Sequence, residues 1–101
     1  QINQAMNDGC TPLYIACQED HVKVVKALLA RKEIQINQAL NDGSTPLFMA
    51  CQKDHVKVVK ALLTSKEIDI NKDWEGKTPL ACAIELGLTE IAALLQQHGA
   101  K

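Results

Sequence analysis

Cysteine and histidine are the residue types in this chain that could supply a nucleophile, a general base or a metal ligand. The cysteines lie at four positions: Cys10, Cys17, Cys51 and Cys82. None of them has the C-x-x-C spacing of a zinc or redox site, and His21 and His55 are 34 residues apart with no carboxylate cluster converging on them. Nothing in the spacing places a base and an orienting group beside Cys10. We therefore expect no enzyme activity, no metal site and no cofactor.

A repeat of about 33 residues organises the whole chain. The sequence DHVKVVKALL occurs at residues 20–29 and returns unchanged at residues 54–63. Residues 1–34 align with residues 35–68 without a gap and differ at seven positions, and residues 69–101 form a third copy that is one residue shorter. Such a period is typical of a solenoid, in which stacked units share a core. We predict a single domain over residues 1–101, with units at about 1–34, 35–68 and 69–101.

Each unit is predicted to contain a projecting turn followed by two helices. The turns are Asn7-Asp8-Gly9, Asn41-Asp42-Gly43 and Glu75-Gly76, whose residue types favour tight hairpins. Thr-Pro pairs at residues 11, 45 and 78 predict helix starts, because the Thr hydroxyl can cap free amides and Pro has no N–H to leave unsatisfied. These first helices should end near residues 20, 54 and 87. The second helices should span about 22–31, 56–65 and 89–97.

Three landmarks follow one another along the units: D-G-x-T-P-L, H-V-x-V-V-x-x-L-L and I-N. With these landmarks the chain resembles an ankyrin-repeat domain over its full length. The resemblance implies an all-α solenoid of stacked helix-turn-helix units with projecting β-hairpin-like fingers. It also implies a noncatalytic module that binds a protein partner through the concave surface formed by the finger tips and the first helices. His21 and His55 would then be the family's structural histidines.

The chain departs from the family pattern at several positions, two kinds of which lie at the helix starts and between the helices. The family's Thr-Pro-Leu-His is Thr-Pro-Leu followed by Tyr14, Phe48 or Ala81, and the Gly between the helices is Asp20 or Asp54 in the first two units. A left-handed residue other than Gly costs on the order of 1 kcal/mol. We therefore expect Gly at positions 20 and 54 to stabilise the fold modestly.

Three of the differences between the first two units, together with turn residues of all three units, define our candidate partner-binding residues. They are expected on the fingers or on the exposed side of the first helix. The set comprises Met6, Asn7, Asp8, Cys10, Glu19, Leu40, Asn41, Asp42, Ser44, Lys53, Trp74, Glu75 and Lys77. Neutral drift at solvent-facing positions would explain the same differences. Trp74 is expected at the position of Asn41 if the residue missing from the third unit precedes it. It is a candidate binding hot spot unless its ring folds back onto the neighbouring finger.

Charge is distributed unevenly over the predicted elements. Acidic residues lie on the fingers, at Asp8, Asp42, Asp73 and Glu75. Lysines project from the second helices on the opposite side, at Lys23, Lys26, Lys57 and Lys60. This pattern favours a protein partner with basic groups on the finger side, and the alternative is a solvated face of each sign. A net charge of -1 and only three aromatic residues argue against nucleic acid or membrane binding.

The near identity of the first two units leaves a second interpretation open. The chain could be an engineered or recently duplicated repeat scaffold with no evolved ligand, although the four cysteines and the irregular third unit favour a natural origin. The opening residues Gln1-Ile2-Asn3 repeat the sequence that begins the second unit. We therefore expect either a fragment of a longer array or an engineered chain.

The cysteines indicate the cellular compartment in which the chain is expected. Cys17 and Cys51 occupy equivalent positions of neighbouring helices, which is too far apart for a disulfide. Free thiols favour a reducing, intracellular compartment, either cytoplasmic or nuclear. We expect a monomer, or weak end-to-end self-association through an uncovered apolar edge near Ile15 and Val24.

Overall fold

Each Thr-Pro pair begins a helix in the computed structural model, which describes residues 2–101. The hydroxyl oxygens of Thr11, Thr45 and Thr78 accept hydrogen bonds of 3.1 to 3.2 Å from the backbone N–H three residues further on. Proline follows each Thr, at a position where a backbone N–H would have no helical partner. The helices that start here are α1 (Pro12–Gln18), α3 (Pro46–Gln52) and α5 (Pro79–Glu85).

A left-handed residue closes each of these helices, two residues after the last helical position. Asp20 has φ 60°, Asp54 has φ 61° and Gly87 has φ 73°. The next N–H, that of His21 in the first unit, donates to the carbonyl oxygen of Ala16 at 2.9 Å, and the same bond recurs in the other two units. These bonds satisfy carbonyls that the helix end leaves free. The predicted ends of the first helices are confirmed.

The second helices are α2 (Val22–Leu29), α4 (Val56–Leu63) and α6 (Thr89–Gln97). The predicted range for α6 is correct, but α2 and α4 are two residues shorter than predicted. Their last turns tighten: the N–H of Arg31 bonds to the Leu28 carbonyl and that of Ser65 to the Leu62 carbonyl, each three residues back. Such tightening is common at helix ends and satisfies carbonyls that have no helical partner.

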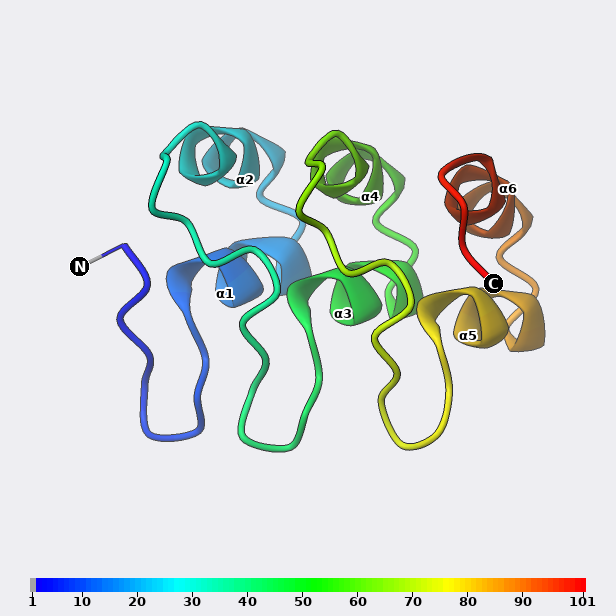
Figure 1. The fold of residues 1–101 in the computed structure, drawn as a ribbon, viewed down its shortest axis with the longest axis horizontal. Helices are drawn as coiled ribbons and strands as arrows, with labels where there is room; N and C mark the ends of the chain where they lie inside the picture. Colours follow the sequence, from blue (N-terminus) through cyan, green and yellow to red (C-terminus); the bar gives the residue numbers. More distant parts are fainter. Residues whose placement is uncertain (1) are drawn as a thin grey trace.

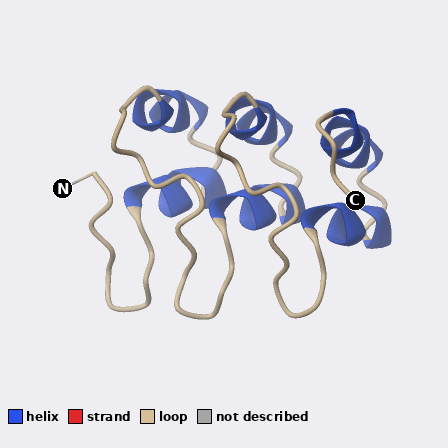
Figure 2. Cartoon of the chain, viewed as in Figure 1, coloured by secondary structure: helices blue, strands red, loops and turns tan. Residues whose placement is uncertain are grey.

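The helices form two layers. Figure 1 shows α1, α3 and α5 in one row, which we call the inner helices, and α2, α4 and α6 in a second row, the outer helices. Each inner helix contacts the next inner helix, each outer helix the next outer helix, and the two helices of a unit contact each other. Figure 2 shows the connecting loops, with the long ones projecting away from the outer helices. The predicted all-α ankyrin-like stack is therefore the observed fold.

The core lies between the two helix layers. Leu47, Ala50 and Cys51 reach it from α3, while Val59 and Leu62 reach it from α4. All five side chains are at most 1% exposed. Small Ala and Cys side chains on the inner helices allow neighbouring helices to approach closely, and each buried Leu or Val contributes about 1.5–3 kcal/mol to stability.

The Asn residues of the first two I-N landmarks tie consecutive units together. Asn37 donates from Nδ2 to the Glu67 carbonyl at 2.8 Å and accepts at Oδ1 from the Asp69 N–H at 2.8 Å. Asn3 makes the same pair of bonds, to the Glu33 carbonyl and the Gln35 N–H. These contacts fix the loop that leaves an outer helix to the start of the next unit.

We name the projecting loops the first finger (residues 5–10), the second finger (39–44) and the third finger (73–77). In the first two, the arms are joined by bonds such as that from the Leu40 N–H to the Ser44 carbonyl at 2.8 Å. Asn41 fastens the second finger to the first, donating from its backbone N–H to the Asp8 carbonyl and from Nδ2 to the Asn7 carbonyl, both at 2.9 Å. A Cβ on Gly9 would lie only 2.7 Å from Asn41 Oδ1, so this close approach requires glycine.

The third finger is shorter because its turn has two residues instead of three. Trp74 and Lys77 exchange backbone hydrogen bonds of 2.8 and 3.1 Å, and both residues between them have positive φ, 52° for Glu75 and 81° for Gly76. That is the geometry of a two-residue hairpin. The missing residue thus follows Trp74, so Trp74 occupies the position of Leu40. The prediction that it takes the position of Asn41 was wrong.

Apolar side chains of the first unit are exposed where the equivalent side chains of the second unit are buried. Ile15 and Val24 are 37% and 48% exposed, whereas the equivalent residues of the second unit, Met49 and Val58, are 9% and 0% exposed because the first unit packs on them. The predicted apolar edge at Ile15 and Val24 is therefore exposed. Among residues 2–101, no helix has the length and apolar character needed to cross a membrane.

Candidate functional site

The fingers and the inner helices together form the surface that holds our candidate residues. Figure 1 shows all three fingers projecting on the side of the inner helices, away from the outer helices. Most candidates are exposed there. The exposed ones are Met6, Asn7, Asp8, Glu19, Asn41, Asp42, Lys53, Glu75 and Lys77, and Leu40 and Trp74 are half-buried. We call this the finger surface.

Cys10 and Ser44 are not part of the finger surface, contrary to the prediction. Cys10 is 8% exposed and Ser44 is 1% exposed. Cys10 packs with Tyr14, Met49 and the half-buried Leu40 in a small apolar cluster under the first two fingers. The hydroxyl of Ser44 is hydrogen-bonded to the phenol of Tyr14 at 2.9 Å. Both residues therefore serve packing between the units and are closed to a partner.

Asp8 and Asp42 hold the turns of the first two fingers in shape and also carry charge. Asp8 Oδ1 accepts the backbone N–H of Cys10, and Asp42 Oδ1 accepts that of Ser44, each at 2.9 Å. These bonds hold the turns in shape, as Asp commonly does at such positions. Both carboxylates remain exposed, so each finger tip carries a negative charge in a fixed place.

Trp74 folds back onto the second finger, which was the alternative to a free projecting ring. Its indole Nε1 donates to the Asp42 carbonyl oxygen at 3.2 Å. The ring also meets Phe48 edge to face, with centroids 5.3 Å apart and planes at 76°. Such an aromatic pair contributes about 0.5–1.5 kcal/mol beyond the area it buries. The ring is held from two sides, and Trp74 is still partly exposed.

A hollow of about 140 Å³ opens beside Trp74, between the third finger and helices α3 and α5. We call it the Trp74 hollow. Its lining comprises Phe48, Gln52, Trp74, Glu75, Lys77, Cys82, Glu85 and Leu86. Aromatic and aliphatic side chains thus stand beside two carboxylates and one ammonium group. Three candidate residues, Trp74, Glu75 and Lys77, are brought together here.

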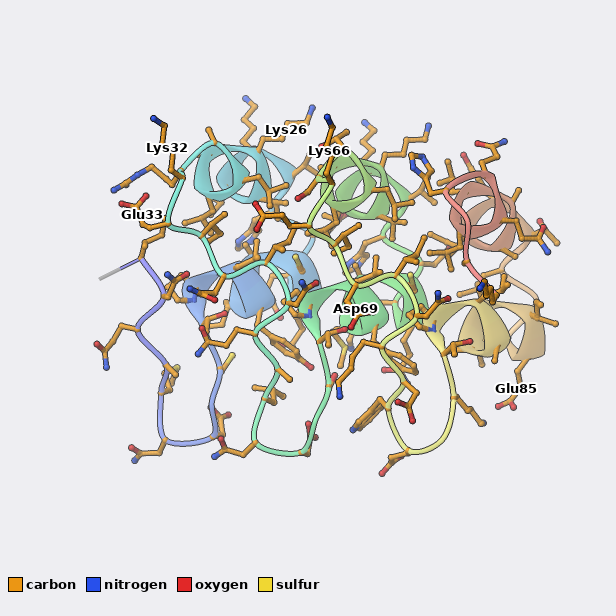
Figure 3. The ribbon with its side chains drawn as sticks, viewed as in Figure 1. Lys26, Lys32, Glu33, Lys66, Asp69 and Glu85 are labelled. Atoms are coloured by element: carbon orange, nitrogen blue, oxygen red, sulfur yellow. The ribbon has the colours of Figure 1, made fainter. Side chains whose placement is uncertain are left out.

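An ion pair crosses the rim of the Trp74 hollow. Lys77 Nζ lies 2.5 Å from Glu85 Oε1, which links the third finger to the last turn of α5. This hydrogen bond to Glu85 raises the pKa of the Lys77 ammonium, so the group stays charged. Figure 3 shows Glu85 on the side of α5 that faces away from the outer helices. The pair neutralises one of the two rim carboxylates and leaves Glu75 without an ion pair within residues 2–101.

The buried thiols have low reactivity. Burial, followed by the charge of Glu85, raises the pKa of Cys82, and burial followed by Asp8 raises that of Cys10. Both thiols therefore stay protonated at neutral pH and are poor nucleophiles. All four cysteines are free, as expected from their spacing. Within residues 2–101 no group of three or more His, Cys, Asp and Glu side chains is arranged to hold a metal ion.

The two histidines before the outer helices differ in surroundings although their local sequences are identical. His55 Nδ1 lies 3.0 Å from the backbone carbonyl oxygen of Cys17, in the preceding unit. The Nδ1–H tautomer donates this bond. His21 is exposed. The contact of His55 is the structural role that the resemblance implies.

Our candidate set left out five residues of the Trp74 hollow: Phe48, Gln52, Cys82, Glu85 and Leu86. One of these residues, Leu86, could have been identified by comparing the third unit with the first two. Leu86 takes the position of Glu19 and Lys53, so a charged position becomes apolar, and its side chain is 51% exposed. Glu19, Lys53 and Met6 do not line the hollow.

Comparison with known proteins agrees with this geometry. The family model described as ankyrin repeats in three copies matches residues 32–101, and the model of the single ankyrin repeat matches residues 8–39. No curated protein matches the chain. Together the matches cover residues 8–101, which include all six helices of the stack. The chain therefore belongs to the ankyrin-repeat family.

Proposed function

We propose that this chain binds a segment of a protein partner on the finger surface, with the Trp74 hollow as the central contact. Ankyrin repeats are in general protein–protein interaction modules and typically noncatalytic. The observation that carries the proposal is a partly exposed tryptophan, held in place at the mouth of a hollow with an apolar wall.

An apolar side chain of the partner fits the wall formed by Trp74, Phe48 and Leu86. Tryptophan is enriched among residues that dominate interface energies. The indole is already fixed by Asp42 and Phe48, so little conformational entropy would be lost on binding. Leu86 is 51% exposed and would lose contact with water when the hollow fills.

Carboxylates around the hollow favour a partner that carries basic groups. Glu75 has no ion-pair partner within residues 2–101, and Asp42 on the second finger and Asp73 on the third finger are exposed. Lys77 is engaged by Glu85 and adds little positive charge of its own to the rim. We propose a segment with an apolar anchor and a neighbouring Lys or Arg. The free thiols further favour a reducing compartment.

Leu86→Lys is the variant that tests this function, because it blocks the hollow and repels a basic partner at an exposed position. Ile84→Lys is a matched control: it is the same change two residues away, at a side chain that is 60% exposed and lies outside the hollow. Each purified protein would be immobilised and incubated with lysate, and captured proteins would be quantified by mass spectrometry. We expect proteins captured by the wild type and by Ile84→Lys to be lost with Leu86→Lys.

Binding of a captured protein would then be measured in purified form by the fluorescence of Trp74, the chain's single tryptophan. Capture that does not depend on Leu86 would contradict the site. Capture of nothing specific would favour the second candidate, a duplicated or engineered scaffold with no evolved ligand. The observation behind that candidate is that the first two units differ at only seven of 34 positions.

A further inference from the structure

The outer helices carry a second charged surface, opposite the fingers. Lys23 and Lys26 on α2 and Lys57 and Lys60 on α4 are all exposed. Figure 3 shows Lys26 on the side of the outer helices, together with Lys32 and Lys66. The ion pairs within residues 2–101 are Arg31–Glu33 and Lys77–Glu85, so none of the four helical lysines is paired with a carboxylate there.

Between α2 and α4, three of these lysines surround a hollow of about 250 Å³, which we call the lysine trough. Its lining comprises Lys26, Lys57, Lys60, Ala61 and Thr64, and it contains no carboxylate. Most of the lining is apolar, because lysine stems and small side chains form it. Three ammonium groups therefore stand around a floor that suits a small apolar group.

The corresponding place between α4 and α6 has different chemistry. The positions of Lys57 and Lys60 are occupied there by Glu90 and Ala93, and the position of Ala61 by Leu94. At this boundary Lys60 takes the position that Lys26 has in the trough. Glu90 stands at the position of Lys57, so the charge there is reversed, and the larger Leu94 stands where the floor of the trough would be. The lysine trough is a local feature of the first two units and not a general consequence of stacking.

We propose that the lysine trough binds an acidic protein segment, separately from the finger surface. Carboxylates of the segment pair with Lys26, Lys57 and Lys60, and an apolar side chain between them rests on Ala61 and Thr64. Charge complementarity selects an anionic ligand. The apolar floor favours a peptide over a nucleic acid, because a phosphate backbone would satisfy the ammonium groups and leave the floor without an apolar contact.

With the lysine trough, the chain has two surfaces that prefer ligands of opposite charge. The finger surface carries acidic tips, whereas the trough is cationic, so two partners of opposite charge could be held at once. Exposed ion pairs are individually weak and are screened by salt. Binding to the trough should therefore weaken as ionic strength rises, and the apolar contact should decide which anions are accepted.

The test uses fluorescence anisotropy with the full chain and three labelled probes. The first probe is an acetylated and amidated peptide with three Glu-Leu-Glu units; the second has Ser in place of each Leu, and the third is oligothymidylate of equal charge. Lys57→Glu combined with Lys60→Glu is the test variant. Lys23→Glu combined with Lys32→Glu is the control, because it changes the net charge equally at exposed residues that do not line the trough.

We expect the leucine peptide to bind the wild type and to lose about tenfold in affinity with the test variant, as several weak charge contacts are lost or reversed. The control variant should lose less than about threefold, through long-range electrostatics alone. The serine peptide and the oligonucleotide should bind more weakly than the leucine peptide. Melting curves by circular dichroism should be alike for both variants, since all four changed residues are exposed.

Four binding results would each overturn the proposal: no binding of the leucine peptide, equal losses in the two variants, tighter binding of the oligonucleotide, or serine and leucine peptides that bind alike. Light scattering at each peptide concentration completes the test. Growth in particle size that is abolished by the test variant would assign the trough to contacts between copies of the chain, which also contradicts an acidic partner segment.

Discussion

The phenol oxygen of Tyr14 lies 2.9 Å from the hydroxyl oxygen of Ser44, and both side chains are almost completely buried. The bond spans two consecutive units. At the next boundary the Tyr becomes Phe48 and the Ser becomes Lys77, so neither polar partner is left alone, and Phe48 packs on Trp74 instead. Two of the differences between the first two units thus belong to the packing of unit on unit and not to ligand binding.

The Tyr14–Ser44 bond predicts a coupled effect on stability. Tyr14→Phe leaves the Ser44 hydroxyl buried without a partner, and Ser44→Ala does the same to the Tyr14 hydroxyl, so each should lower the free energy of unfolding by about 1–2 kcal/mol. The double variant should lose less than the sum, with a coupling of about 1 kcal/mol. Urea unfolding of the four proteins measures this, and strict additivity would show that the bond contributes nothing.

The two equivalent histidines allow a prediction with an internal control. His55→Ala removes the hydrogen bond to the Cys17 carbonyl and leaves that oxygen unpaired, which should lower the free energy of unfolding by about 1–2 kcal/mol. His21→Ala is the same change in the same local sequence at an exposed side chain, and should stay within about 0.5 kcal/mol of the wild type. Equal losses in chemical denaturation would mean that the effect arises within each helix start and not between units.

Local chemistry explains why most of the fold could be predicted from the sequence. Thr45 before Pro46 caps a helix through a bond three residues away, and Asp54 takes a left-handed conformation because the helix end needs one. Such features depend on a few neighbouring residues. The 34-residue period then supplied the order of the units without knowledge of any long-range contact.

The finger surface was harder to predict because burial there depends on the adjoining unit. Cys10 and Ser44 follow polar turn residues and look exposed in the sequence, yet the first two fingers pack against each other and cover them. Trp74 was assigned the wrong position because the length of its turn was unknown. The Trp74 hollow itself combines residues from α3, α5 and the third finger, which only the stacked arrangement brings together.

The left-handed residues after α1 and α3 predict a stabilising substitution. Asp20 and Asp54 have φ near 60°, and neither carboxylate is hydrogen-bonded within residues 2–101. Gly removes the strain of the side chain in this conformation, and its greater freedom in the unfolded chain offsets part of the gain. Asp20→Gly and Asp54→Gly should each raise the free energy of unfolding by up to about 1 kcal/mol.

Alanine supplies the control for these glycine variants, since it removes the carboxylate and keeps a Cβ in the left-handed conformation. Asp54→Ala should therefore not stabilise the fold. Guanidinium denaturation midpoints compare the three proteins. A gain with Ala as large as that with Gly would mean that the carboxylate, and not the backbone conformation, is unfavourable.

Two thiols in the core make stability depend on pH in the alkaline range. Burial raises the pKa of Cys17 from 9.0 to about 12, and burial followed by the neighbouring Cys82 raises that of Cys51 as well. Above pH 9.0 the unfolded chain releases these protons while the folded chain keeps them, so the unfolded state is favoured. The stabilisation that comes from keeping the Cys17 thiol protonated is fully present below pH 9.0. It is lost as the pH rises from 9.0 to about 12.

Once the unfolded thiol is largely ionised, the free energy of unfolding should fall by about 1.4 kcal/mol per pH unit for each of these thiols. Urea unfolding measured at intervals between pH 8 and pH 10, in a reducing agent, covers the onset of this fall. Cys17→Ala loses stability at every pH because it leaves a small void. Above pH 9, however, its free energy of unfolding should fall less steeply with pH, by about the contribution of one thiol. A slope that is unchanged in Cys17→Ala would assign the alkaline loss to other groups, and a flat profile in the wild type would show that the two thiols titrate alike in the folded and unfolded chain.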